Sequence, residues 1–262
     1  MKRFDLDNAT DAHFADRYNL FIASIVVLSV IVWATNSQSL ETIVSWCIII
    51  VFIGNVKRIN NTKPFSYFIR MTGYFFPYLV PYLFFGERSI ILFTPLIKGC
   101  IFSVFVFCIW VYAHIDEIKV MLSDQLALDT VKVPKWAFAI RVYSVLGSAI
   151  CEELFFRGYI LGLSMPSYAK IMISITYFSL SHIVLPWGNL YKAKDILNQI
   201  LIGSCSVAAF YIGKCTIPCV LLHTLINSLT AIKHIKAYDR HYGHIEKYER
   251  LQNGSLFGDK EL

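Results

Sequence analysis

The chain has 262 residues, of which 56% are hydrophobic and 16% are charged, and its formal net charge is +6. Soluble domains carry about 25% charged residues, so this composition excludes an ordinary soluble enzyme and favours a membrane protein. Its basic residues are not interleaved with aromatic residues in a recognised pattern, which argues against nucleic acid as a partner.

Apolar segments recur along the whole chain. The first, residues 18–34, is close to the length of about 20 helical residues that spans a bilayer. Two prolines, Pro77 and Pro81, lie in the third segment, where we expect a kinked helix. The sequence therefore predicts an all-α, polytopic membrane helix bundle with about eight transmembrane helices. The seven segments after the first are 42–56, 71–86, 90–113, 137–163, 169–187, 196–213 and 216–232.

Basic residues predict the orientation of this bundle. With eight spans, 19 of the 24 Lys and Arg residues fall on the side that holds both termini, and three fall on the other side. Positively charged loops face the cytoplasm. We therefore expect an integral membrane protein with both termini in the cytoplasm, and with loops that contact anionic lipid.

The polar stretch 115–135 divides the chain into two membrane regions, and it predicts a cytoplasmic or interfacial connection. Only the region after it contains ionisable side chains in the middle of apolar segments. The predicted parts are a cytoplasmic N-terminus at 1–17, a four-helix membrane region at 18–114, the connection at 115–135, a four-helix catalytic region at 136–232 and a basic cytoplasmic tail at 233–262.

Ionisable residues at membrane depth cost roughly 2.5–3.5 kcal/mol each and usually mark function. Glu153 and Arg157 are four residues apart, with the acid first, which favours a helical ion pair. Glu152 projects about 100° away around the helix. It has no partner on its own helix, so another helix must provide one. The candidates in the later apolar segments are His182, His223 and Asn227.

A carboxylate and a histidine that share a water form a general base, and a histidine and an asparagine on one helical face can stabilise an oxyanion. His223 and Asn227 are four residues apart and share such a face. This combination suits amide hydrolysis without a serine or cysteine nucleophile. Two alternatives remain open: Cys151 or Ser181 as the nucleophile, and zinc held by Glu152, His182 and His223.

Three motifs follow one another on separate apolar segments: Glu152-Glu153-x-x-x-Arg157, Phe178-x-x-x-His182 and His223-x-x-x-Asn227. Their order resembles that of the CPBP (CAAX protease and bacteriocin-processing, or Abi) family of intramembrane glutamic endopeptidases. Phe156-Arg157-Gly158 also matches the usual first motif of this family.

The resemblance implies a hydrolase that needs no metal or other cofactor and acts on a membrane-associated peptide or protein. In this family pattern Glu152 activates the attacking water, and His182 holds or shares the proton of that water. His223 and Asn227 stabilise the oxyanion. Glu153, Arg157 and Phe178 then have supporting roles, the last as part of the pocket wall.

Substrates expected for such a protein in a bacterial cell membrane are a leader peptide, a pheromone, a bacteriocin or a lipidated C-terminus. An alternative is a scaffold without proteolytic activity, which provides bacteriocin immunity or regulates other membrane proteins. A transporter is a further alternative, but the sequence has no inverted repeats that would favour it.

The depth of the site can also be predicted. A membrane helix entered at Trp136 would place Glu152 about 24 Å deep, too far from the cytoplasmic end of the segment that carries His182. We therefore expect residues 136–146 to lie near the inner interface, with the helix entering around Gly147. The site would then lie in the inner half of the membrane, open to the cytoplasm.

Overall fold

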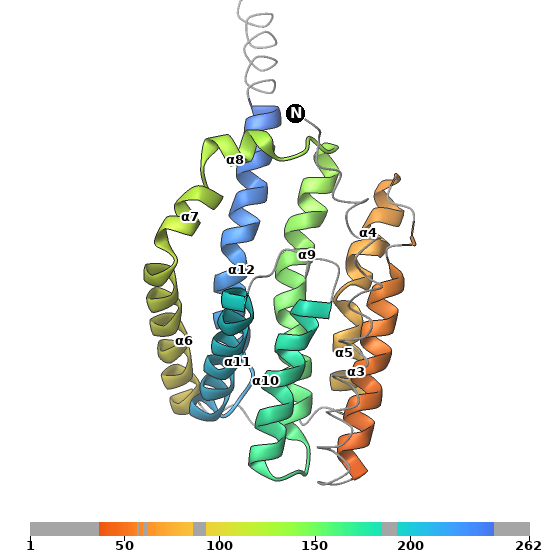
Figure 1. Ribbon diagram of the computed structural model, residues 1–262, viewed down its shortest axis with the longest axis vertical. Coiled ribbons are helices and arrows are strands. Elements are labelled where there is room, and N and C mark those ends of the chain that lie inside the picture. Colours follow the sequence, from red (N-terminus) through yellow and green to blue (C-terminus); the bar gives the residue numbers. More distant parts are fainter. Residues whose placement is uncertain (1–36, 57, 60–61, 86–92, 185–192, 244–262) are drawn as a thin grey trace, which may run out of the picture.

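The computed structural model describes residues 37–243, except 57, 60–61, 86–92 and 185–192. The predicted N-terminus, the first predicted span and most of the basic tail lie outside these residues. The described part is all-helical, with no strand, as the sequence predicts. Its helices form one elongated bundle (Figure 1).

Two regions of the bundle pack along its length. The N-terminal helices are α3 (Ser37–Val56), α4 (Pro64–Gly73) and α5 (Phe76–Phe85). They lie at one side of α9 (Lys135–Glu153) in Figure 1, and α4 and α5 contact α9. The opposite side of the bundle is formed by α6 (Phe93–Ala113), α11 (Ala193–Gly213) and α12 (Ile217–Tyr238), with α10 (Ser167–Val184) against α11.

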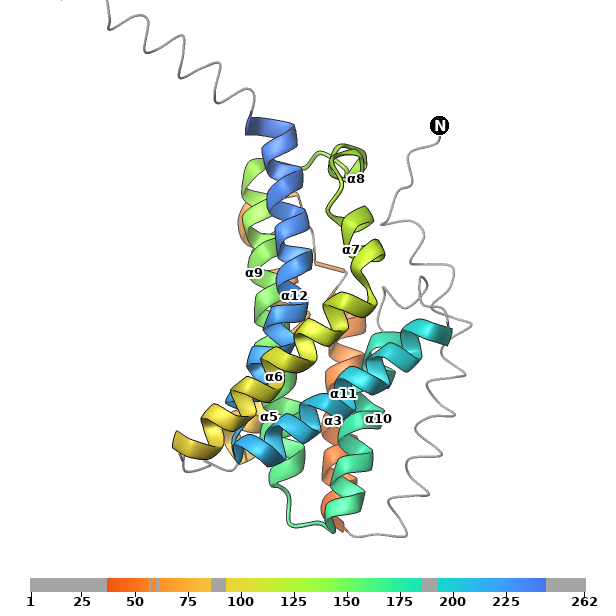
Figure 2. The same ribbon diagram turned by 90° about the vertical axis from the view of Figure 1, so that its left-hand side faces the viewer.

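The helices alternate in direction, as a polytopic bundle requires. α3, α6, α10 and α12 run toward the end of the bundle that carries α7 (Ile115–Met121) and α8 (Asp124–Asp129) (Figures 1 and 2). α5, α9 and α11 run away from that end. The second view shows α6 and α11 crossing the bundle obliquely beside each other (Figure 2).

Close approach of backbones holds α6, α11 and α12 together. A Cβ atom on Gly99 of α6 would lie 2.7 Å from the Cα of Gly213 in α11 and 2.7 Å from Cγ of Pro218 in α12. Only glycine therefore fits at Gly99, as in membrane bundles that pack through small residues. Lys214 adopts a left-handed conformation with φ of 55°, which ends α11 and turns the chain into α12.

The outer surface of the bundle is apolar. Ile101 and Phe105 on α6 are 64% and 61% exposed. Within the described residues, α6 and the segment Asp195–Gly213 are long and apolar enough to cross a membrane, and Thr42–Val56 is a shorter apolar helix. The count of about eight spans stays a prediction, because the first lies outside the described residues and five of the other seven do not reach this length and hydropathy.

Three predicted segments differ from the helices observed. The third, 71–86, is interrupted at Tyr74 and Phe75, between α4 and α5, and the interruption precedes both prolines. The fifth, 137–163, changes from α9 into the π-helix η1 (Leu154–Tyr159) and the 3₁₀-helix η2 (Ile160–Gly162). The last continues to Tyr238 and then into η4 (Asp239–Gly243), beyond the predicted end at residue 232.

An ionic contact joins the central connection to the last helix. Asp124 in α8 accepts hydrogen bonds from Lys236 at 2.7 Å and from Arg240 at 2.5 Å. These two cations lower the pKa of Asp124 below its ordinary value, mainly through the hydrogen bonds. The same carboxylate raises the pKa of Arg240. The contact ties α8 to the side of α12 at the end of the bundle that carries α7 (Figure 1).

Candidate active site

The first motif lies where α9 changes into a π-helix. Glu152 and Glu153 are the last two residues of α9, and Arg157 lies in η1, whose side chains Phe155 and Phe156 are fully buried. Single π turns inside helices occur frequently at functional sites. The change of helix type comes immediately after the two carboxylates, so both are held by regular α-helical backbone.

Glu153 is held in a buried ionic network. Its Oε1 accepts a hydrogen bond from Arg157 at 3.0 Å and lies 2.9 Å from Nδ1 of His223, and its side chain is fully buried. Arg157 also donates to the backbone carbonyl of Gly203 in α11 at 3.0 Å. The predicted pair of Glu153 and Arg157 is therefore present, and it links α9, η1, α11 and α12.

Glu152 faces a different environment. Its Oε2 lies 3.8 Å from Nε2 of His182, and the two side chains are 12% and 17% exposed. A distance of 3.8 Å is too long for a direct hydrogen bond, but one water at about 2.8 Å from each atom would join them. The Nδ1 atom of His182 lies 2.9 Å from the carbonyl of Phe178. A carbonyl can only accept, so Nδ1 carries the proton and a neutral ring has its lone pair at Nε2, toward Glu152.

His223 and Asn227 come from α12, on the other side of the cavity. Nδ1 of His223 lies against Glu153, so Nε2 is the free ring nitrogen. Asn227 donates one amide hydrogen to the carbonyl of Val145 in α9, at 3.0 Å, and its second amide hydrogen remains for another acceptor. The structure thus places all four candidate catalytic residues around one region, and it pairs His223 with Glu153 rather than with Glu152.

Phe178 separates the buried charges from the cavity. Its ring centroid lies 4.6 Å from that of His182 and 5.6 Å from that of His223, and the Arg157 guanidinium carbon is 4.6 Å from its centre. This one ring therefore orients both imidazoles and shields Arg157 from solvent. A cation over an aromatic face is also favourable, by about 0.5–2 kcal/mol.

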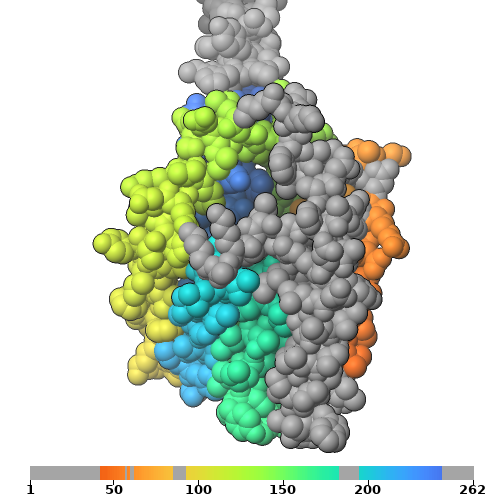
Figure 3. Space-filling view, viewed as in Figure 1, coloured from red at the N-terminus to blue at the C-terminus, as the bar shows by residue number. Residues whose placement is uncertain are grey.

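A cavity of about 240 Å³ opens beside these side chains. In the space-filling view, part of α12 is visible at the base of a hollow bordered by the α7–α8 segment (Figure 3). The cavity volume is large enough for several waters or a short stretch of peptide. It is lined by Phe178, His182, His223, Asn227, Trp110, Met121, Gln199, Ile202, Ile226, Leu229 and Thr230.

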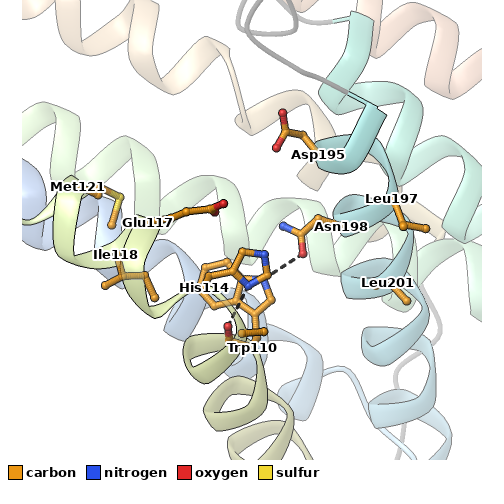
Figure 4. Close-up of a pocket in the computed structure, with 10 residues that line it drawn as sticks. Trp110, His114, Glu117, Ile118, Met121, Asp195, Leu197, Asn198 and Leu201 are labelled. Carbon is orange, nitrogen blue, oxygen red and sulfur yellow. Dashed lines mark hydrogen bonds between the residues drawn. The ribbon is translucent and has the colours of Figure 1, made fainter.

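A second cavity of about 390 Å³ adjoins the first, and Trp110 and Met121 line both. Trp110 donates to Oδ1 of Asn198 at 3.0 Å, which joins α6 to α11 at this shared wall. Figure 4 shows Glu117 of α7 extending toward Asn198 across the cavity, with Asp195 nearby on α11. The two cavities together connect the histidines with the end of the bundle that carries α7.

The site also has the donor set of a zinc centre. One oxygen of Glu152 and one ring nitrogen each of His182 and His223 lie within 4.8 Å of one another. Ligand atoms at about 2.1 Å from a tetrahedral zinc lie about 3.4 Å apart, so binding would need these atoms to approach one another by up to about 1.4 Å. Both histidines have hydrogen-bonded Nδ1 atoms, an arrangement common in metal ligands. Zinc thus remains compatible with these residues.

Several features were not predicted from the sequence. The link from His223 to Glu153 was missed because the spacing of Glu153 and Arg157 already explained both charges.

The two alternative nucleophiles are both buried. Ser181 donates to the carbonyl of Tyr177 at 2.8 Å and accepts from Trp46 at 3.0 Å. The residue Ser181 is 1% exposed, so its hydroxyl is not an accessible nucleophile. Cys151, the other alternative, is buried.

The fold and the site together define a helical protein with a carboxylate–histidine centre enclosed by apolar helices. Residues 134–229 match the family model described as Rce1-like, type II CAAX prenyl endopeptidase. This segment is less than half of the chain, and its match agrees with the resemblance to the CPBP family that the three motifs predicted. No curated protein and no solved structure matches the chain. The family implies a protease with a peptide or protein substrate, and its apolar helices indicate a membrane protein.

Proposed function

We propose that this protein is an intramembrane endopeptidase that hydrolyses a peptide bond with a water activated by Glu152 and His182. The observation that carries the proposal is the distance of 3.8 Å between Glu152 Oε2 and His182 Nε2, which one water can bridge. Such a water donates one hydrogen to each of these atoms, and its oxygen then has a lone pair free to attack a carbonyl carbon.

The proposed reaction requires a donor for the oxyanion that develops on the attacked carbonyl. Asn227 has one amide hydrogen left after its bond to Val145. His223 donates from Nε2 only if that atom also carries a proton, which makes the ring an imidazolium because Nδ1 donates to Glu153. The buried carboxylate of Glu153 balances that positive charge. Oxyanion donors of this kind contribute about 10²–10³-fold to kcat.

The adjoining cavity supports an approach of the substrate from the end of the bundle that carries α7. We propose that this end faces the cytoplasm, which is the predicted orientation of residues 115–135. The substrate class is a membrane-associated peptide or protein, such as a leader peptide, a pheromone, a bacteriocin or a lipidated C-terminus. The proposed location is the bacterial cell membrane, with both termini in the cytoplasm.

The test compares the wild-type protein with Glu152→Gln, which keeps the shape of the side chain and removes its charge. The two proteins are purified at full length, placed in lipid nanodiscs and assayed for cleavage of a farnesylated CAAX peptide. In parallel, the membrane peptides of cells that express the wild type are compared with those of cells that express Glu152→Gln. We expect a loss of cleavage of at least about 10³-fold for Glu152→Gln, since general base and water site are both lost. Equal cleavage by both would contradict the proposal.

The scaffold alternative predicts a different outcome in the same cells. A bacteriocin-immunity or regulatory phenotype that survives Glu152→Gln would belong to binding of another membrane protein, not to proteolysis. Loss of the phenotype together with loss of cleavage products supports the endopeptidase.

The proposal that no metal takes part has its own test. A zinc ligand role needs a lone pair at Nε2 of His223, whereas the oxyanion role needs a proton there. We expect 1,10-phenanthroline to leave cleavage unchanged, and the purified protein to contain less than 0.1 equivalent of zinc. Loss of activity on chelation, restored by added Zn²⁺, would show a metalloprotease instead.

A further inference from the structure

The N-terminal helices bring a buried tyrosine to the proposed base. The ring of Tyr78 in α5 is fully buried, and its centroid lies 5.6 Å from those of Phe155 and Phe156. The position of Tyr78 along α9 and η1 follows from Phe75 and Tyr82, which flank it in the sequence and contact two glycines of these helices. A Cβ on Gly147 would lie 2.8 Å from the ring of Phe75, and one on Gly158 would lie 2.6 Å from the ring of Tyr82. Tyr78 therefore lies beside the stretch that begins at Cys151.

The hydroxyl of Tyr78 has polar neighbours but no hydrogen bond of regular geometry within the described residues. Glu152 lies about one helical turn before Phe156, against which the Tyr78 ring packs, and Ser181 directly precedes His182, which faces Glu152. The Oε2 atom of Glu152 is likewise buried and without a partner of regular geometry. One of these groups is a donor and the other an acceptor, and a buried polar group left unpaired costs about 1–3 kcal/mol.

Ser181 is the weaker acceptor for this tyrosine. Its hydroxyl oxygen already accepts from the indole nitrogen of Trp46, and its hydrogen is donated to the carbonyl of Tyr177. An ionised carboxylate forms hydrogen bonds about twice as strong as a neutral acceptor does. The network formed by Trp46 and Ser181 therefore leaves Glu152 as the favoured acceptor.

We propose that Tyr78 is a positioning residue, whose hydroxyl donates to the Glu152 carboxylate, directly or through one water, and holds Oε2 toward His182. This inference rests on the proposed function. It makes the N-terminal region part of the active centre, although the family motifs lie in the C-terminal region alone. It also explains why a tyrosine hydroxyl is placed among phenylalanines in the core of the bundle.

The test removes this hydroxyl and no other atom. Tyr78→Phe is compared with Tyr177→Phe, which removes an equally buried hydroxyl without a partner of regular geometry, next to Trp46. Both variants are assayed at full length in nanodiscs with the farnesylated CAAX peptide, or with the peptide found by comparing cells. We expect Tyr78→Phe to lower kcat about 10- to 100-fold with KM within twofold, and Tyr177→Phe to keep kcat within threefold.

A second measurement separates positioning from a general effect on folding. Because Tyr78 acts through Glu152, adding Tyr78→Phe to Glu152→Gln should lower the residual rate by less than twofold. The inference would be overturned if Tyr78→Phe and Tyr177→Phe lowered kcat equally, or if the loss of kcat in Tyr78→Phe matched a fall in its folded fraction. It would also be overturned if Tyr78→Phe lowered the rate of Glu152→Gln as much as it lowers the wild-type rate. Unchanged cleavage in Glu152→Gln itself would instead overturn the proposed function.

Discussion

Two adjacent glutamates occupy opposite environments in this protein. Glu153 is fully buried and held by Arg157 and His223, whereas Glu152 is 12% exposed and lies near His182 across a gap that a water can fill. They are consecutive on one helix, so about 100° of rotation separates them. The comparison shows that helix geometry alone can divide one residue type into a structural anchor and a reactive group.

The surroundings explain this division physically. A buried carboxylate is tolerated only when opposite charge and hydrogen bonds replace its lost hydration. Glu153 has both, so its negative charge is used to hold Arg157 and His223 in place. Glu152 lies beside His182, which lines the cavity, and has an oxygen without a partner of regular geometry, so it remains available to a reacting water.

The largest effect is expected from replacing His182, the histidine that faces Glu152. We expect His182→Gln to lower kcat about 10²–10⁴-fold through loss of proton sharing. Its stability should change by about 1 kcal/mol or less, because one hydrogen bond to Phe178 is lost. Rates of peptide cleavage and thermal transitions of the nanodisc samples measure both effects.

His114 offers a matched control for this substitution. Its Nδ1 also lies 2.9 Å from the carbonyl four residues earlier, that of Trp110, but it lies in the adjoining cavity. His114→Gln should therefore keep kcat within about threefold. Comparable losses in the two variants would contradict the role given to His182.

On the buried side, we expect Arg157→Leu to destabilise the protein by about 3–5 kcal/mol, because the fully buried Glu153 carboxylate then loses its permanently charged partner and keeps only its contact with His223. The fraction of folded protein after heating, or the yield of monodisperse protein, reports this loss. Arg141→Leu, in α9, removes a hydrogen bond to Tyr67 at 3.2 Å and should cost about 1 kcal/mol. Adding Glu153→Gln to Arg157→Leu should restore part of the lost stability; a further loss instead would refute the charge argument.

Access to the reactive side can be tested at the wall between the two cavities. Met121→Trp places a larger side chain where both cavities are lined, so we expect KM for the peptide to rise about tenfold with kcat unchanged. Val120, its neighbour in α7, is 65% exposed, and Val120→Trp should leave KM within twofold. An unchanged KM in Met121→Trp would show that the substrate does not pass this wall.

The smallest effect is expected far from both glutamates, at the contact of α8 with α12. Because Lys236 and Arg240 lower the pKa of Asp124, this contact is present above the ordinary aspartate pKa of about 3.9 and is lost as the pH falls through the lowered value. Hydrogen exchange of α8 should therefore increase below about pH 4. Asp124→Asn should show this faster hydrogen exchange of α8 already at pH 7, with little further increase as the pH falls. If exchange in Asp124→Asn increased with acid as much as in the wild type, the assignment would be refuted.

The C-terminal site could be predicted in unusual detail because polar residues are rare in apolar segments and each needs a reason. The pair of Glu153 and Arg157 followed from a spacing of four residues, and the shared face of His223 and Asn227 from the same rule. The family assignment also followed from three motifs in order. Membrane depth and the division into five parts remain predictions.

Other features could not be read in this way. The contact of His223 with Glu153 joins residues 70 positions apart, and no local pattern carries it. Tyr78 is one tyrosine among 15, and only packing shows that its buried ring lies against Phe155 and Phe156, about one turn from Glu152. The break between α4 and α5 and the π-helix after Glu153 lie inside continuous apolar stretches, so hydropathy alone predicted longer, simpler segments.

By itself, the sequence determined the helical class and which few polar side chains had to meet, because apolar length and fixed helical spacing are local properties. The tertiary structure decided which partner each of those side chains takes. It assigned His223 to Glu153 and His182 to Glu152, and it packed Tyr78 of the N-terminal region against Phe155 and Phe156 of the first motif helix. The physical reason is that pairing across helices depends on their rotation and depth, which packing of whole helices sets and no single segment encodes.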